Sequence, residues 1–254
     1  GKMYAADWAA APVLFFYRED LFQEAGVKLP IQTFDDLANE GQKLKAKGQF
    51  MEQFNASGPW LAKFDHYLEA RNGQGVFDKD GNVLLDSQEA IDTLQMMSDL
   101  AHKQKVLDVY DTSTAEVVGY QRNQVAGTIH ADWWAHYIME AEVKEQVGKW
   151  RAQVMPQQIK GVATAPLWGG IGTVIYQKSP VRDLLLDLYR FAFLTTANAA
   201  KVWTEIGFLP TMRSTWTLPD VLNFPYPTLG GQKWGQVAVQ AATNLVAPYY
   251  GPFW

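Results

Sequence analysis

Apolar and polar positions alternate along the chain as short apolar runs followed by amphipathic stretches. The run VLFFYR at residues 13–18 is almost wholly apolar, which predicts a buried strand. The stretch EDLFQEA follows at once and stops at Gly26, so we expect a short helix with a glycine at its C-terminal end. A strand that leads directly into a helix is typical of α/β proteins.

A longer helix is predicted to begin after Thr33. This residue suits the N-cap position, and Asp36 stands three residues further on, as a capping box requires. Leu37 and Leu44 fall on one face, and Gly48 follows a last turn rich in lysine. The pattern therefore predicts both ends of this helix.

A second long helix is predicted to begin after Asp86 or Ser87, either of which can serve as its N-cap. Apolar residues recur at every third position and are expected to form the buried face of the helix. They are Ile91, Leu94, Met97 and Leu100.

The alternation of strands and helices continues to the end of the chain. Strands are expected at residues 125–130, 150–157 and 166–180. A helix is expected to begin near Trp60, and two more lie between the Ser-Pro pair at 179–180 and Gly207. The chain contains no internal repeat, and the fold class predicted from this order is α/β.

Length and charge limit the possible functions. The 254 residues can form one large domain or two lobes that share a hinge. The net charge is −5 with no basic run, so nucleic acid is not expected as a partner. No apolar stretch approaches the ~20 residues that span a bilayer. The chain has no cysteine, which excludes thiolate metal sites and cysteine nucleophiles.

Tryptophan is unusually abundant, with 10 copies in the chain. Its ring has a large apolar face and one hydrogen-bond donor, and therefore suits ligands such as sugars, which have C–H faces and hydroxyl rims. Five tryptophans stand at or just beyond the end of a predicted strand or next to a Gly/Pro break, where α/β proteins gather ligands. They are Trp8, Trp60, Trp133, Trp168 and Trp254. Asp7 and Asp132 precede two of them and can accept sugar hydroxyl groups.

Metal and nucleotide sites are not predicted. His130, Asp132 and His136 are the metal candidates, but the six-residue spacing of the histidines fits neither one helix face nor one strand face. Asp132 is better explained as a helix N-cap with the histidines partly exposed beside it. The GGIG sequence at residues 169–172 lacks the spacing of a dinucleotide motif. We therefore expect no cofactor and no metal.

An enzyme is the weaker alternative to a binding protein. No GxSxG motif occurs, so a serine nucleophile is not indicated. Glycan hydrolysis needs two carboxyl groups facing each other across a cleft. Asp7, Asp65 and Asp132 could supply such groups, but their spacing does not pair them.

Several motifs, taken in order, resemble the family 1 extracellular solute-binding proteins, the maltose-binding-protein-like group. The segment GKMYAADWAAAPVLFFYREDLFQEAG resembles the family's opening of a crossover strand, an aromatic strand and a DLF-x-x-AG helix. The segments GTIHADWWAHYI, WGGIGTVIYQKSP and GFLPTMRS resemble its later strand, its returning hinge strand and its G-x-L-P motif. Arg18 and Glu19 depart from the usual Y-N-K-D-L-F.

The resemblance implies a type II periplasmic-binding-protein-like fold with two lobes, present here mainly as the second lobe. Residues 1–10 would form a hinge strand, residues 11–170 the second lobe, residues 171–214 a returned part of the first lobe, and residues 215–254 the final segment of the second lobe. The family's usual opening segment and closing helices are missing, and no signal segment is present. The sequence is therefore expected to be a fragment truncated at both ends.

The resemblance also implies a function: non-catalytic binding of a carbohydrate in a cleft between the lobes, for delivery to the permease subunits of an ABC importer. Such a protein would be periplasmic or anchored by lipid at the outer face of the cytoplasmic membrane. Trp60, Trp133 and Trp254 would stack on sugar rings. Asp7, Trp8, Asp132, Trp168 and Arg213 are the further candidate contacts. A polyol, glycerol phosphate or a polyamine remains the alternative ligand.

Overall fold

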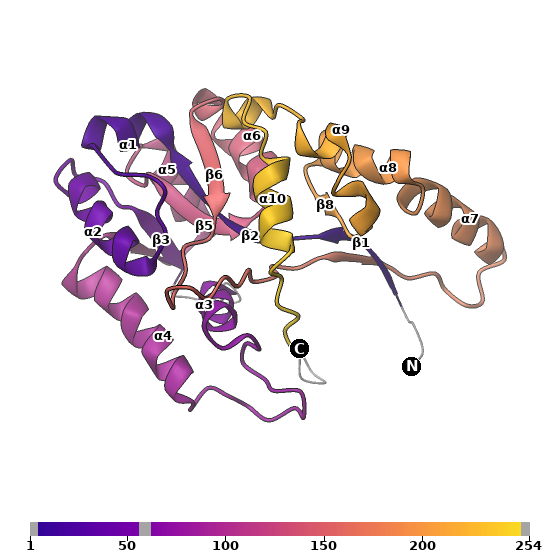
Figure 1. Ribbon diagram of the computed structural model, residues 1–254, viewed down its shortest axis with the longest axis horizontal. Coiled ribbons are helices and arrows are strands. Elements are labelled where there is room, and N and C mark those ends of the chain that lie inside the picture. Colours follow the sequence, from indigo (N-terminus) through magenta and orange to yellow (C-terminus); the bar gives the residue numbers. More distant parts are fainter. Residues whose placement is uncertain (1–4, 56–61, 250–254) are drawn as a thin grey trace.

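The structure is a computed structural model that describes residues 5–55 and 62–249. It consists of a body built around a three-stranded sheet and a second three-stranded sheet, with shorter strands, that crosses the edge of the body and carries an arm. Figure 1 shows the body with helices on both faces of its sheet, and the arm extending to one side. The α/β class is confirmed.

The body sheet is centred on β2 (Val13–Arg18), the predicted buried strand. It pairs antiparallel with β5 (Gly127–Ala131) on one edge and with β6 (Trp150–Val154) on the other. Successive side chains of a strand point to opposite faces, so Phe15 and Phe16 enter two different hydrophobic clusters. Both rings are fully buried.

The two clusters use tryptophan differently. The cluster around Phe16 contains four tryptophans with no exposed surface: Trp134, Trp150, Trp203 and Trp234. The cluster around Phe15 is filled by phenylalanine, leucine and tyrosine. Much of the tryptophan content therefore stabilises the core, and abundance alone does not mark a ligand site.

The helices begin and end largely as predicted. Helix α1 (Glu19–Ala25) ends at Gly26, whose φ of 69° is the left-handed conformation that glycine adopts without strain. Helix α2 (Phe34–Lys45) has the predicted capping box between Thr33 and Asp36. Helix α3 spans Ala62–Asn72, and Ser87 caps α4 (Gln88–Ser98).

The predicted buried face of α4 is wrong. Ile91 and Leu94 are 53% and 60% exposed, whereas Met97 and Leu100 are buried. Each step of three residues turns a helix by about 300°, so a run at this spacing drifts by about 60° per step. Its first and fourth members then lie on opposite faces. Ala90 and Thr93 complete the observed buried face.

The rest of the body is built from shorter elements. Strands β3 (Glu52–Asn55) and β4 (Leu107–Tyr110) form a parallel pair, and Thr112 caps α5 (Ser113–Gln121). Helices α6 (Glu140–Glu142), α9 (Pro219–Leu222) and α10 (Gly235–Ala242) follow along the chain. π-helical turns lie at Asp99–Lys103, Ala135–Met139 and Val202–Ile206, and 3-10 turns at Lys144–Gln146, Arg213–Thr215 and Pro227–Leu229.

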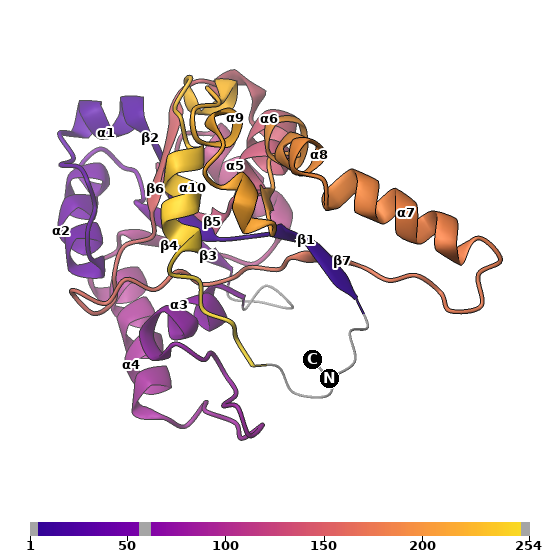
Figure 2. The same ribbon diagram turned by 45° about the vertical axis from the view of Figure 1, so that its right-hand side comes forward.

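The crossing sheet has β1 (Ala6–Ala10) at its centre, antiparallel to β7 (Ile171–Thr173) and β8 (Leu209–Pro210). Strand β7 leads into α7 (Arg182–Phe193) and α8 (Thr196–Lys201). Helix α7 begins two residues beyond the predicted Ser-Pro start. Figure 2 shows α7 projecting away from the body.

Helix α7 has an apolar face that no described residue covers. Leu184, Leu188 and Phe191 stand four and three residues apart, which places them on one face, and each is more than half exposed. Only Tyr189 of this helix is buried. Among the described residues, no helix is long and apolar enough to cross a membrane.

The two faces of α4 allow a matched test of this packing. Met97→Ala leaves a cavity in the core and is expected to lower the free energy of unfolding by about 2–5 kcal/mol. Leu94→Ala removes an exposed side chain and is expected to change it by less than about 0.5 kcal/mol. Urea denaturation of both variants measures the difference. Equal losses would contradict the observed orientation of α4.

Candidate functional site

The candidate site forms where residues 11–12 join β1 to β2. The backbone here is paired on both sides. On one side Pro12 O accepts from Asp132 N at 3.1 Å, and on the other Ala11 O accepts from Trp168 N at 2.9 Å. Two segments that are distant in sequence, at the end of β5 and before β7, are thereby brought together. Trp133 and Trp168 converge for this reason.

These two tryptophans and two histidines form one aromatic group, which we call the Trp–His cluster: His66, His130, Trp133 and Trp168. The indoles meet edge to face, with centroids 6.0 Å apart, and Trp133 Nε1 donates to Trp168 O at 3.4 Å. The imidazole of His130 stacks on Trp168 at 3.8 Å, and that of His66 lies 4.6 Å from it. Both tryptophans are half-buried, so each ring keeps surface open to solvent.

Of the two histidines expected to lie partly exposed beside a helix cap, His136 does so and His130 does not. His130 is buried, and burial, reinforced by the nearby Lys63 and His66, holds its pKa well below the usual value. It packs as a neutral ring beneath Trp168. His136 is half-buried outside this cluster, where its Nδ1 lies 2.9 Å from Glu140.

Asp132 requires a correction. It was expected to accept ligand hydroxyl groups, but its side chain has no exposed surface. One carboxylate oxygen accepts from Trp133 N at 2.7 Å and the other from Leu209 N at 2.8 Å. Asp132 therefore fixes the start of the turn at Trp133 and ties the body to β8. Its role is structural because both oxygens already have protein donors.

Asp7 and Trp8 lie on β1, beside the cluster. Trp8 is half-buried and stacks on Phe193 of α7 at 4.8 Å, with Phe208 at its edge. Trp8 and Trp133 pack against the same small core of Ala9, Val202 and Phe208. The Asp7 side chain is exposed, and its backbone carbonyl accepts from Thr211 and Tyr189.

The other predicted residues are placed elsewhere or lie outside the described part. Arg213 is exposed, and its guanidinium lies over the ring of Trp216 at 5.7 Å. None of the described contacts joins Arg213 to the Trp–His cluster. Trp60 and Trp254 lie outside the described residues. Trp133 follows the end of β5 and Trp168 stands next to Gly169, as predicted, whereas Trp8 lies within β1.

Helix α3 brings buried charge to the cluster. Lys63 forms an ion pair with Glu52 and donates to Gln53 O at 2.5 Å and to Thr128 Oγ1 at 3.2 Å. Glu52 also accepts from Ile129 N at 2.5 Å. Burial raises the pKa of Glu52 although Lys63 opposes the shift. This network fixes α3 against β3 and β5, and so sets the position of His66.

The next turn of α3 carries Asp65, His66 and Glu69, all buried. Burial lowers the pKa of His66 to about 4 and raises that of Glu69 to about 8. Burial also raises the pKa of Asp65 to about 6. Sequence analysis did not identify His66 or Glu69 as site residues. The available signal was that polar residues recur around α3 without forming one polar face.

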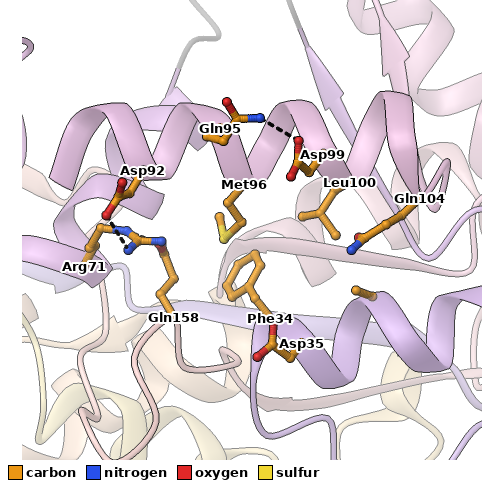
Figure 3. A pocket seen from close by; sticks show the side chains of 11 residues that line it. Phe34, Asp35, Arg71, Asp92, Gln95, Met96, Asp99, Leu100, Gln104 and Gln158 are labelled. Atoms are coloured by element: carbon orange, nitrogen blue, oxygen red, sulfur yellow. Dashed lines mark hydrogen bonds and ion pairs between the residues drawn. The ribbon is translucent and has the colours of Figure 1, made fainter. Parts of the chain in front are cut away.

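A separate hollow of about 370 Å³ opens between α2, α3 and α4. Figure 3 shows its floor of Phe34 and Met96 and an ion pair between Arg71 and Asp92 at its rim. None of the six predicted site residues that the structure describes lines it. Within residues 5–55 and 62–249, no three His, Asp or Glu side chains are grouped so that they could hold a metal ion.

Comparison with known proteins identifies similar chains. A family model described as bacterial extracellular solute-binding protein matches residues 1–200. The arabinooligosaccharide-binding protein of Halalkalibacterium halodurans is 24% identical over 224 residues, covering 86% of this chain and 50% of that protein. The arabinooligosaccharide-binding protein of Bacillus subtilis is 25% identical over 227 residues, covering 87% of this chain and 51% of that protein. The chain thus spans about half the length of the curated relatives it matches.

Two solved structures share the fold. The binding protein of B. animalis subsp. lactis in complex with β-1,6-galactobiose has a TM-score of 0.80 and 22% identity, covering 98% of this chain and 64% of that one. Maltose-bound T. maritima MalE3 has a TM-score of 0.75 and 22% identity, covering 98% and 63%. At this identity the likeness establishes the fold alone, and it confirms the predicted periplasmic-binding-protein-like class.

Glu69 predicts a pH dependence of stability. Its pKa rises from 4.5 to about 8 on folding, so the folded state retains a proton that the unfolded state has lost between these values. The contribution of Glu69 to the stability of the folded state is therefore full below pH 4.5 and declines as the pH rises toward 8. The pKa of His66 is about 4 in the folded state and 6.5 in the unfolded state, so its titration affects stability mainly below pH 6.5. The range from pH 6.5 to 8 therefore reports on Glu69.

Between pH 6.5 and 8, the free energy of unfolding of the wild-type protein is expected to fall by about 2 kcal/mol more than that of Glu69→Gln. The variant has no carboxyl proton to release. Urea denaturation at several pH values between 6.5 and 8 measures the free energy of unfolding of both proteins. Parallel curves for the two proteins would show that Glu69 does not hold its proton.

Proposed function

The chain belongs to the bacterial extracellular solute-binding protein family, and we propose that the protein is the non-catalytic substrate-binding component of an ABC importer, with a carbohydrate as ligand. The observation that carries this proposal is the convergence of Trp133 and Trp168, both half-buried, at the junction of the body and the crossing sheet. Two indole faces at a steep angle suit a guest with more than one apolar face.

The known ligands of similar proteins support the same class. Curated relatives are named for arabinooligosaccharide binding. In our proposal Trp133 and Trp168 stack on sugar rings, Trp8 extends the aromatic surface along β1, and Asp7 accepts hydroxyl groups. Trp60, Trp254 and Arg213 remain predicted contacts.

Charge favours a neutral ligand over glycerol phosphate. A phosphate group would need cations beside the aromatic rings. Lys63 is the cation near the Trp–His cluster among the described residues, and it is paired with Glu52. Arg213 lies over Trp216.

A polyamine would need several carboxylates around the aromatic rings. Of the two predicted carboxylates, Asp132 already accepts backbone hydrogen bonds with both oxygens. A glycan hydrolase needs two carboxyl groups facing each other across a cleft, and it is disfavoured because both oxygens of Asp132 already accept from backbone N–H groups.

The proposed mechanism is closure about the crossing sheet. We assign residues 1–10 to a hinge strand, residues 11–170 and 215–254 to the second lobe, and residues 171–214 to a returned part of the first lobe. The uncovered apolar face of α7 supports this assignment, because such a face is stable when it packs against further structure. A ligand that contacts both lobes would shift the equilibrium toward the closed form.

The proposed partners and location follow from the family. Members are extracellular proteins, so we place this one in the periplasm or, with a lipid anchor, at the outer face of the cytoplasmic membrane. The permease subunits of the importer would receive the closed, loaded form.

Tryptophan fluorescence of the full-length protein tests the proposal. Titration with neutral oligosaccharides, arabino-oligosaccharides among them, is expected to shift the emission because indoles become covered. Trp133→Ala is expected to abolish that shift and to weaken binding by about 1–3 kcal/mol, by analogy with stacking of bases on aromatic rings. Leu94→Ala, on the exposed face of α4, is the matched control and should titrate as wild type. An unchanged titration of Trp133→Ala would remove the stacking role.

A further inference from the structure

One turn of α3 contains an unusual concentration of buried polar atoms without partners. Five such atoms belong to four side chains of this turn: Asp65 Oδ1, both ring nitrogens of His66, Tyr67 Oη and Glu69 Oε1. His66 is 5% exposed and Glu69 has no exposed surface. Most buried polar groups in folded proteins have a hydrogen-bond partner, so this group requires an explanation.

The turn lies directly against the ring that is proposed to stack on the ligand. The imidazole of His66 is 4.6 Å from Trp168. The other carboxylate oxygen of Glu69 accepts from the backbone N–H of Leu167, the residue before Trp168, at 3.3 Å. The same oxygen is 3.7 Å from His66 Nδ1. The unpartnered atoms and the half-buried Trp168 thus form one continuous region.

We infer that this turn of α3 is the polar floor of the ligand site, and that His66 and Glu69 hydrogen-bond hydroxyl groups of a sugar seated against Trp133 and Trp168. The inference rests on the proposed function and names a set of contacts and a ligand chemistry for it. Hydroxyl groups of the ligand would then be the hydrogen-bond partners that these atoms lack in the free protein. Leaving these atoms unpartnered in the free protein is then a cost that binding recovers.

The protonation states select the chemical class of the ligand. Burial keeps the pKa of His66 near 4, so at neutral pH its ring is uncharged and offers one N–H donor and one acceptor nitrogen. With a pKa of about 8, Glu69 is largely protonated and offers one O–H donor and acceptor oxygens. Hydroxyl groups also donate and accept. A neutral polyhydroxylated ligand therefore matches this floor better than a phosphate or an ammonium group.

The surroundings of His66 explain why it stays neutral. Asp65 and Lys63 on its own helix act on it in opposite directions, and burial outweighs both. His130 faces it from β5 and is itself held neutral. Lys63 is already bound to Glu52, Gln53 and Thr128, so it is not free to bind a ligand anion.

The test uses His66→Phe in the full-length protein, because phenylalanine keeps a ring against Trp168 and removes both nitrogens. Calorimetric titration with a neutral oligosaccharide that the wild type binds is expected to show affinity reduced by about tenfold or more. Thermal unfolding of the ligand-free variant is expected at the same or a higher temperature, since two unpartnered buried atoms are gone. His66→Gln, which retains a donor and an acceptor, is expected to lose less affinity than His66→Phe.

His136→Phe is the matched control, because His136 is half-buried and pairs with Glu140 away from the cluster. It is expected to bind as the wild type does. Wild-type affinity in His66→Phe would overturn the inference, with the proposed function left standing. A lower unfolding temperature of the ligand-free variant would also overturn it, because His66 would then be part of the structural core. A wild-type protein that binds no neutral oligosaccharide would refute the proposed function itself.

Discussion

The pairing of residues 11–18 along both edges is the constraint on which the rest of the structure depends. Strand β2 is hydrogen-bonded to β5 and β6, and the two residues before it are held between Asp132 and Trp168. A segment paired on both sides cannot shift its register without turning Phe15 and Phe16 into the wrong clusters. The same pairing brings two distant tryptophans together.

Asp132 extends this constraint from the body to the crossing sheet. Its buried carboxylate joins the turn at Trp133 to the first residue of β8, and β8 is antiparallel to β1. A buried carboxyl group is stabilised only when its oxygens have donors, and here two backbone N–H groups supply them. The aromatic site is therefore held by hydrogen bonds at the point where the body meets the proposed hinge. This arrangement can orient the Trp133 ring while the arm moves.

The proposed site combines an apolar platform with polar atoms held out of water. Four buried tryptophans stabilise the core, whereas Trp8, Trp133 and Trp168 keep surface open to solvent. The neutral ring of His130 supports Trp168 from below, and the turn of α3 adds donors and acceptors beside it. Apolar stacking supplies affinity, and polar atoms at fixed positions supply selectivity.

The sequence by itself determined the local structure: the strand at 13–18, the capped starts of α2 and α4, the glycine end of α1, and the motif order typical of the family. Hydrogen bonding within a few residues fixes such features, so neighbouring residues suffice to predict them. Only the tertiary structure decided which side chains meet solvent. It buried Asp132, exposed Ile91 and Leu94, and placed His66 and Glu69 of α3 against Trp168. Burial depends on what packs against a residue from distant parts of the chain, and a local pattern does not contain that information.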